Sequence, residues 1–410
     1  MKKLNPSHTP IIALVLAVFS APLVAQSRGQ LRRMLDANQA FALRDAVERG
    51  NAPAFYRGAV EESLNRIRDA RHELKKAIEA DPRSHEAFEA HEMLANMSFR
   101  SGAYSEALAE LEAAHGLRPD SADVNNFLAL LRTLAAWPGM RVAERRGSRF
   151  QMTGDERRWL PVTIDGKQAA YGFDTGAALS VMGRADAKML GLEVRHVDMQ
   201  LNEASGKPVP GVDVAIVRDM RIGGLHLRNV PFFVMQDTGE PFAKMAVGTR
   251  GLIGLPVLLA MRTMRWNSAG WFAFGSDARL TQPAAQNLLF HGSTAIVQLT
   301  VEGEPLIFSL DTGAIDTDLN EGFAKALPKL LAAGQKETRA ITGMGGSVQY
   351  ESVLLGPVTF SLGGRDVTLK APHVFPAHSL GSFDGNLGHD ILDQANSVTI
   401  DFRRMALQLK

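Results

Sequence analysis

The chain of 410 residues contains no cysteine. This absence excludes disulfides, cysteine nucleophiles, iron–sulfur clusters and zinc sites with thiolate ligands. An excess of one charge sign is also missing, because 45 Lys and Arg stand against 44 Asp and Glu. Proteins that bind nucleic acid usually need a basic excess or a basic patch. We therefore expect no nucleic-acid partner.

Long hydrophobic runs are scarce, and the longest lies near the N-terminus. Lys2 and Lys3 precede an apolar stretch over residues 11–19, and residues 21–25 end in the small residue Ala25 at a plausible cleavage point. This pattern predicts a secretory signal peptide over residues 1–25. The alternative is an uncleaved membrane anchor, but the stretch is short and Pro22 interrupts it.

No later segment approaches the ~20 apolar residues of a membrane-spanning helix. We therefore expect no stable membrane insertion after signal cleavage. Export of a chain without cysteine is typical of a bacterial periplasm, so we expect a periplasmic or secreted bacterial protein.

The length predicts two or three domains. Residues 28–137 are rich in Ala, Leu, Glu and Arg and poor in β-branched residues, which predicts helices. A weak repeat places the same residue types at the same spacing twice, namely Ala70, Leu74, Ala77 and Pro82, and then Ala107, Leu111, Ala114 and Pro119. The repeat resembles the tetratricopeptide pattern, with flanking helices over 31–49 and 121–137. The alternative is a helical bundle in which this spacing arose by chance.

The helical pattern ends at Trp137-Pro138-Gly139. Residues 138–156 are polar and rich in Arg, and we interpret them as a linker. From residue 157 apolar and polar residues alternate and Gly-containing turns recur, which predicts β-strands.

The β-rich part of the sequence contains a second, longer repeat. Residues 160–177 align without a gap to residues 297–314, and each copy ends in Asp-Thr-Gly-Ala. A second landmark has a Gly, one further residue, an Ile or Leu, and a closing Gly, and it follows at 251–254 and at 385–388. We therefore predict a first lobe over 157–275, an inter-lobe linker over 276–292 and a second lobe over 293–410.

Two Asp-Thr-Gly words in such a repeat resemble the retropepsin-like aspartic proteases, in which each of two lobes contributes one Asp. The resemblance implies a multidomain fold, with an all-α tetratricopeptide-like domain followed by two all-β lobes that form a pseudo-symmetric acid protease. It implies that Asp174 and Asp311 are catalytic. The supporting loop residues are Thr175, Gly176, Ala177, Thr312, Gly313 and Ala314. Each Thr would donate its hydroxyl across the lobe interface.

Two carboxyl groups held close together cannot both ionise easily, so the pair keeps one proton. Such a pair can activate a water for attack on a peptide carbonyl, without a metal, a nucleophilic Ser or any other cofactor. We expect an endopeptidase whose substrate is a polypeptide. Ala177 and Ala314 stand where pepsin-like enzymes usually have Ser, so we expect a milder pH optimum than that of pepsin.

Each lobe should also supply a hairpin flap over the substrate. Candidate tips are Ser205 and Gly206 in the first lobe and Gly343, Met344, Gly345 and Gly346 in the second. The alternative is that both are ordinary surface hairpins. His389 follows the second landmark, and we expect it to be structural.

We expect the helical domain to recruit a substrate or a protein partner. Two complete lobes in one chain favour a monomer with an intramolecular lobe pair, although lobes could also pair between chains. The main alternative to an enzyme is a non-catalytic peptide-binding or scaffold protein. Retention of both Asp residues with their Thr and Gly neighbours favours the enzyme.

Overall fold

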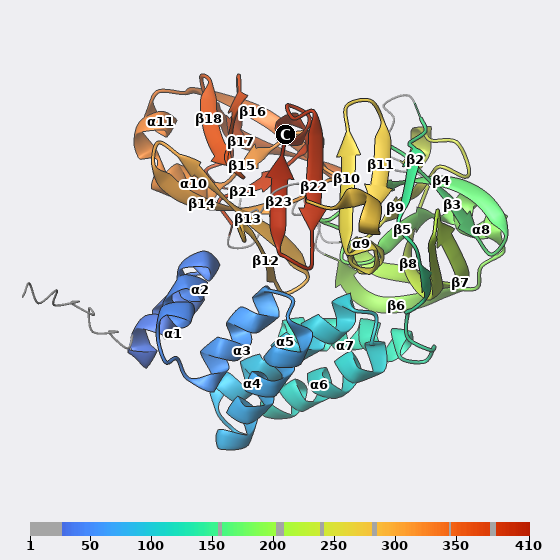
Figure 1. Cartoon of the computed structure of the whole chain (residues 1–410), viewed down its shortest axis with the longest axis horizontal. Coiled ribbons are helices and arrows are strands. Elements are labelled where there is room, and N and C mark those ends of the chain that lie inside the picture. The colour runs from blue at the N-terminus through green and yellow to red at the C-terminus, as the bar shows by residue number, and fades with distance from the viewer. Residues whose placement is uncertain are drawn as a thin grey trace, which may run out of the picture.

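The computed structural model describes residues 27–154, 158–201, 209–237, 242–280, 285–343, 346–377 and 383–410. The predicted signal peptide over 1–25 lies outside these residues. Helices form the N-terminal part, and the rest of the described chain is rich in strands, as Figure 1 shows. The predicted order of a helical part followed by a β-rich part is confirmed.

The helical region runs from residue 28 to residue 134. Ser27, Ser84 and Ser121 each accept a hydrogen bond from a backbone N–H of the first turn, which fixes the start of three helices. Residues 31–49, predicted as one helix, form two, because Asn38 between them has a φ of 52°. The helices are α1 (Arg28–Asp36), α2 (Ala40–Arg49), α3 (Ala54–Ser63), α4 (Ile67–Ala80), α5 (His85–Arg100), α6 (Tyr104–Leu117) and α7 (Ala122–Leu134).

The first β region follows the helices. Its sheet runs in the order β1-β8-β5-β9-β4-β3-β7-β6 among the described residues. The elements are β3 (Leu160–Ile164), β4 (Lys167–Phe173), β5 (Ser180–Gly183), α8 (Arg184–Leu190), β6 (Val194–Leu201), β7 (Val209–Ile222), β8 (Leu225–Met235), η1 (Phe242–Lys244), β9 (Gly251–Ile253) and α9 (Leu255–Met261).

The second β region has its own sheet, in the order β16-β17-β20-β15-β21-β14-β13-β18-β19, with β12 paired to β13. The elements are β12 (Leu288–His291), β13 (Thr294–Val301), β14 (Glu304–Leu310), β15 (Asp318–Leu319), α10 (Glu321–Ala326), α11 (Pro328–Ala332), β16 (Gln335–Gly343), β17 (Gly346–Leu354), β18 (Val358–Leu362), β19 (Arg365–Leu369), β20 (His373–Val374), β21 (Gly385–Leu387) and α12 (His389–Leu392).

A third sheet joins the two β regions, in the order β2-β11-β10-β22-β23. Strand β10 (Thr263–Asn267) follows the first β region and pairs with β22 (Ser397–Asp401) from the end of the chain. Strand β11 (Trp271–Phe274), η2 (Gly275–Ala278) and β23 (Ala406–Leu409) complete this part. The pairing holds the end of the first region beside the end of the second (Figure 1).

Two segments expected as linkers contain strands. Within 138–156, β1 (Arg141–Arg145) pairs with β8 and β2 (Ser148–Gln151) pairs with β11. Within 276–292, β12 pairs with β13. The expectation of a plain linker was therefore wrong for both. Strands β1 and β2 lie at sheet edges, where one side faces solvent and charged residues are common, so their sequence does not differ from that of a linker.

The helical region packs against both β regions. Arg100 is 1% exposed, forms an ion pair with Glu62, and donates a hydrogen bond of 2.6 Å to the Gly292 carbonyl next to β12. Its guanidinium lies 4.5 Å from the centroid of the Phe290 ring. On the other side, buried apolar residues of α5 to α7 form one cluster with residues of β5 to β8 in the first β region. The helices therefore share their core with the sheets.

Candidate active site

The two Asp-Thr-Gly loops each follow a strand of a sheet. Asp174 follows β4 and Asp311 follows β14. Strand β9 lies parallel to β4, and β21 lies parallel to β14. The Asp174 N–H donates to the Ile253 carbonyl at 2.9 Å, and the Asp311 N–H donates to the Leu387 carbonyl at 3.0 Å. The two sequence landmarks thus form the strands that hold these loops.

Thr175 and Thr312 hold the two loops together. The Thr175 N–H donates to Thr312 Oγ1 at 3.0 Å, and the Thr312 N–H donates to Thr175 Oγ1 at 3.1 Å. Each hydroxyl also donates across the interface, Thr175 to the Leu310 carbonyl at 2.6 Å and Thr312 to the Phe173 carbonyl at 3.1 Å. Both side chains are buried. Four reciprocal hydrogen bonds therefore fix the position of one loop on the other.

The glycine of each loop, Gly176 and Gly313, leaves room for the carboxyl group of the opposite loop. A Cβ atom on Gly176 would lie 2.9 Å from Cγ of Asp311, and one on Gly313 would lie 2.6 Å from Cγ of Asp174. No larger residue fits at such separations without displacement. Both Asp side chains are half-buried, and each carboxyl group lies against the glycine of the opposite loop. The structure thus brings together Asp174 and Asp311 from the two halves of the β-rich part.

Electrostatics oppose double ionisation of this pair. Burial, and then the neighbouring carboxylate of Asp311, raise the pKa of Asp174 well above its ordinary value. The backbone N–H groups of Gly176 and Ala177 act in the opposite direction but do not cancel the effect. The arrangement therefore favours one proton held between two carboxyl groups, which provides a general acid beside a general base.

The surroundings of the two carboxyl groups differ. Asp174 accepts from the Gly176 N–H at 2.7 Å, and Asp311 accepts from the N–H groups of Gly313 at 2.8 Å and Ala314 at 3.0 Å. Asp311 also accepts from the side-chain amide of Asn386 at 2.9 Å. Sequence reasoning missed Asn386. The available signal was its place in the second landmark, where the first landmark has Leu252.

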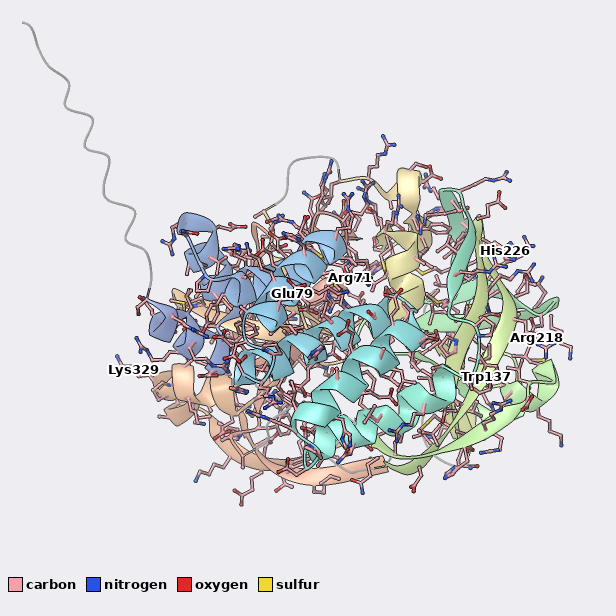
Figure 2. All side chains as sticks on the ribbon, turned by 90° about the horizontal axis from the view of Figure 1, so that it is seen from below. Arg71, Glu79, Trp137, Arg218, His226 and Lys329 are labelled. Carbon is pink, nitrogen blue, oxygen red and sulfur yellow. The ribbon has the colours of Figure 1, made fainter. Side chains whose placement is uncertain are left out.

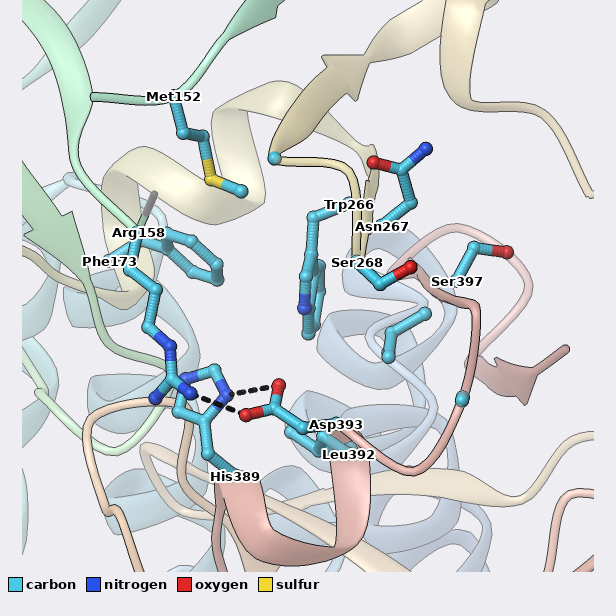
Figure 3. Close-up of a pocket in the computed structure, with 13 residues that line it drawn as sticks. Met152, Arg158, Phe173, Trp266, Asn267, Ser268, His389, Leu392, Asp393 and Ser397 are labelled. Carbon is cyan, nitrogen blue, oxygen red and sulfur yellow. Dashed lines mark hydrogen bonds and ion pairs between the residues drawn. The ribbon is translucent and has the colours of Figure 1, made fainter. Parts of the chain in front are cut away.

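His389 lies behind the second loop. Its Nε2 donates to the Thr312 carbonyl at 2.9 Å, and its Nδ1 lies 3.2 Å from Asp393 Oδ1. Burial of Asp393 opposes its ionisation, but the hydrogen bond and charge of His389 and the charge of Arg158 hold its pKa below the ordinary value. Figure 3 shows both partners bound to Asp393.

This cluster closes one end of a cavity of about 250 Å³. Apolar side chains, among them Phe173, Trp266 and Leu392, line much of the remainder (Figure 3). Phe173 immediately precedes Asp174, so the cavity lies beside the Asp-Thr-Gly loops, but neither Asp is among its lining residues. The contacts of His389 support the loop that carries Asp311.

Two further acidic residues follow the second loop. Asp316 is exposed and pairs with Arg339 at 2.7 Å. Burial raises the pKa of Asp318 to about 6, and the carboxylates of Asp316, Asp390 and Asp311 act in the same direction. Asp318 therefore lies in an acidic surrounding next to the paired carboxyl groups.

The predicted flap residues lie in or beside long hairpins. Strands β6 and β7 form one hairpin and β16 and β17 form the other. Gly343 pairs with Gly346 at the end of the second hairpin. Ser205, Gly206, Met344 and Gly345 lie outside the described residues. Figure 2 shows the green strands of the first β region, with the labelled Arg218 and His226, beside the cyan end of the helical region at Trp137.

Within the described parts of the chain, no cluster of three or more His, Asp or Glu side chains has the arrangement of a metal site. Among the helices in these same parts, none has both the length and the apolar character needed to cross a membrane.

Comparison with known proteins gives a match for one part of the chain. Residues 160–257 match the family model described as "Aspartyl protease". No curated protein matches the sequence. Among solved structures, EIAV protease complexed with an inhibitor is 27% identical to this chain in sequence. The aligned region covers 25% of this chain and 86% of the EIAV protease chain, and the TM-score is 0.19. Residues 160–257 of the protein are therefore similar in sequence to the aspartyl protease family.

Proposed function

We propose that the protein is an aspartic endopeptidase that hydrolyses peptide bonds with a water molecule activated jointly by Asp174 and Asp311. One observation carries this proposal: the two carboxyl groups lie together on Asp-Thr-Gly loops that the hydroxyls of Thr175 and Thr312 lock to each other. The match of residues 160–257 to the aspartyl protease family supports it.

We further propose that the β-rich part consists of two pseudo-symmetric lobes, 157–275 and 293–410. Matching strand pairs support this. The pairs β3–β4 and β13–β14 are antiparallel hairpins, β4–β9 and β14–β21 are parallel, and β5–β9 and β15–β21 are antiparallel. Each lobe would thus place one Asp on the same loop of the same fold, and the site would need no second chain.

The reaction follows from the shared proton. The ionised carboxyl accepts a proton from water as the water oxygen attacks the carbonyl carbon of the peptide. The protonated carboxyl donates its proton to the carbonyl oxygen. Proton transfer to the peptide nitrogen then accompanies cleavage of the C–N bond. In this proposal the hairpins β6–β7 and β16–β17 act as flaps that exclude water from the cleft.

We propose that the helical region is tetratricopeptide-like and recruits a polypeptide substrate or a protein partner. The paired helices α3–α4 and α5–α6 and the burial of Ala70, Ala107 and Ala114 support this. From the N-terminal sequence pattern we also propose a periplasmic or secreted bacterial protein. The proposed working form is a monomer.

A cleavage assay tests the function. The protein and its Asp174→Asn and Asp311→Asn variants are incubated with denatured protein from acid to neutral pH, and new N-termini are sequenced. We expect cleavage by the parent and a loss of at least 10³-fold in each variant. The matched control is Asp277→Asn, at an exposed carboxylate, which should retain full activity. Absence of cleavage by the folded parent at every pH would favour a non-catalytic peptide-binding protein.

A further inference from the structure

The paired carboxyl groups receive unequal support from the side chains around them. Asn386 lies on β21, is 7% exposed, and donates its Nδ2–H to Asp311 Oδ2 at 2.9 Å. Ser309 on β14 donates its hydroxyl to Asn386 Oδ1 at 2.6 Å. Because the Ser309 hydroxyl donates to the amide oxygen of Asn386, the amide nitrogen of Asn386 faces the carboxyl group of Asp311. Ser309, Asn386 and Asp311 therefore form a directed chain of hydrogen bonds.

The first β region lacks this chain at the equivalent place. Ser309 and Asn386 are register partners of β14 and β21, and Gly172 and Leu252 are the register partners of β4 and β9. Neither Gly172 nor Leu252 has a side-chain donor. Within the described residues, the hydrogen bonds that Asp174 accepts therefore come from backbone N–H groups.

We propose that Asn386 is a positioning residue that makes the pair asymmetric, holding Asp311 as the ionised carboxylate and leaving the proton on Asp174. An N–H group needs an acceptor, and an ionised carboxylate accepts at both oxygens. A protonated Asp174 can in turn donate to the ionised Asp311, because the two carboxyl groups lie together between Gly176 and Gly313. The proposal rests on the proposed function and deepens it.

Most of the other charged groups near Asp311 oppose its ionisation, so the donor amide of Asn386 is needed to favour the ionised form. Asp174 faces it directly, and Asp318 on β15 interacts with it. Asp316, Asp390 and Arg339 interact with Asp318, and His389 of α12 lies behind the loop on the Thr312 carbonyl. Most of these groups are acidic and oppose a negative charge on Asp311. The Asn386 amide offsets them by donating directly to the charged form.

The asymmetry assigns the two roles in hydrolysis. Asp311 accepts the proton of the attacking water, and Asp174 donates its proton to the carbonyl oxygen, which gives a gem-diol. Asp311 then gives its proton to the peptide nitrogen as the C–N bond breaks, and Asp174 recovers a proton from a gem-diol hydroxyl. The products are a carboxylic acid and an amine, and both carboxyl groups return to their starting state.

The test variant is Asn386→Leu, which copies Leu252 of the first β region. We expect the acid limb of kcat/KM against pH to move upward by about one pH unit, because the charged form of the pair loses a donor. KM at the optimum should change less than kcat. Ser309→Ala, which frees the amide, should give a smaller shift in the same direction. If Asn386→Leu does not fold, Asn386→Val serves instead, since Val suits a strand.

The control is Asn287→Leu. Asn287 also bridges backbone through its amide, to both the N–H and the carbonyl of Leu407, but it does not touch the pair. This variant should lose stability without any shift of the acid limb. A merely structural role of Asn386 predicts the same result for both variants, and that result would overturn the inference while leaving the cleavage activity in place.

A titration independent of turnover completes the experiment. In protein labelled with ¹³C at Asp Cγ, the Asp311 signal is identified by its loss in Asp311→Asn. We expect this signal to titrate at higher pH in Asn386→Leu than in the parent. An unchanged titration would contradict the role of Asn386, whereas failure of the proposed function would appear separately, as absence of Asp174-dependent cleavage by the parent.

Discussion

Thr175 and Thr312 each donate and accept across the boundary between the two loops, and neither hydroxyl has access to water. Thr312→Val keeps the shape of the side chain but leaves the Thr175 N–H and the Phe173 carbonyl without partners. Unsatisfied buried groups cost about 1–3 kcal/mol each, so we expect a loss of about 2–4 kcal/mol in the free energy of unfolding. Urea denaturation measures it.

Thr359→Val is the matched control for this substitution, because the Thr359 hydroxyl lies on an exposed strand face and bonds Thr368 there. A change within about 0.5 kcal/mol is expected for it. Equal losses in the two variants would mean that the buried hydroxyls are not what locks the loops.

Asp318 makes stability depend on pH. Because burial raises its pKa to about 6, the folded protein retains a proton that the unfolded chain releases near pH 4. Stability therefore falls as pH rises from about 4 to about 6, and it stays lower above that range. Asp318→Asn removes this loss, so we expect a gain of about 1–2 kcal/mol at pH 7 and no difference near pH 4. Denaturation at both pH values checks the sign.

Substitutions at Ala177 and Ala314 should shift the acid limb of the activity profile in the direction opposite to that of Asn386→Leu. Both carry backbone N–H groups that donate to an Asp, but neither has a side-chain donor. A hydroxyl introduced by Ala177→Ser and Ala314→Ser would favour the ionised carboxyl. We expect the acid limb of the activity profile to move to lower pH in the double variant. A shift to higher pH would contradict this account of the milder optimum.

At the scale of elements, α7 supports the edge strand β6 of the first hairpin. Asn126 of α7 accepts from the Gln200 N–H and donates to the Gln200 carbonyl, both at 2.8 Å. The Arg195 guanidinium lies 4.2 Å from the centroid of the Trp137 ring. Apolar side chains of β6 and β7 belong to the same buried cluster as those of α7. The helical region thus holds one of the two proposed flaps.

Asn126→Ala tests this contact. We expect faster hydrogen exchange of the Gln200 amide and its neighbours in β6. An edge strand has a neighbouring strand on one side only, so the Gln200 backbone groups would lose their hydrogen-bond partner. Asn125→Ala is the control, since Asn125 is exposed and its side-chain amide donates to the Pro119 carbonyl just before α7, not to β6. Equal exchange of β6 in the two variants would show that the Asn126 contact does not order the strand.

The same scale shows what a sequence can predict. The repeated Asp-Thr-Gly-Ala word and the landmark strands follow from identity between two copies, and the helices follow from composition and Ser caps. Strands β1 and β2 could not be predicted in this way, because they pair with strands that lie far away in the chain. Strand β12 forms a hairpin with the adjacent β13, and it was included in the expected linker. Asn386 was missed since its effect depends on a contact across β14 and β21. Local patterns do not encode such contacts.

At the scale of the whole molecule, the helices and the sheets share buried surface. Truncation to residues 138–410 would expose the apolar side chains of β6, β7 and β12 that the helices cover. We expect the truncated chain to aggregate or to remain insoluble, because an exposed apolar patch of this kind promotes association. Expression followed by sedimentation measures it. A soluble, active fragment with the parent's melting temperature would show that the helical region is dispensable for folding.

Arg100 ends α5, yet the carbonyl of Gly292 to which it donates lies 192 residues further along the chain. At a synthesis rate of ~5–20 residues per second, the carbonyl follows the guanidinium after about 10–40 s. During that interval Arg100 and Glu62 lack the cover of β12, so α3 and α5 remain hydrated where they later pack. This contact between α5 and the second β region can therefore form only after residue 292 has been made, although the helices themselves are complete much earlier.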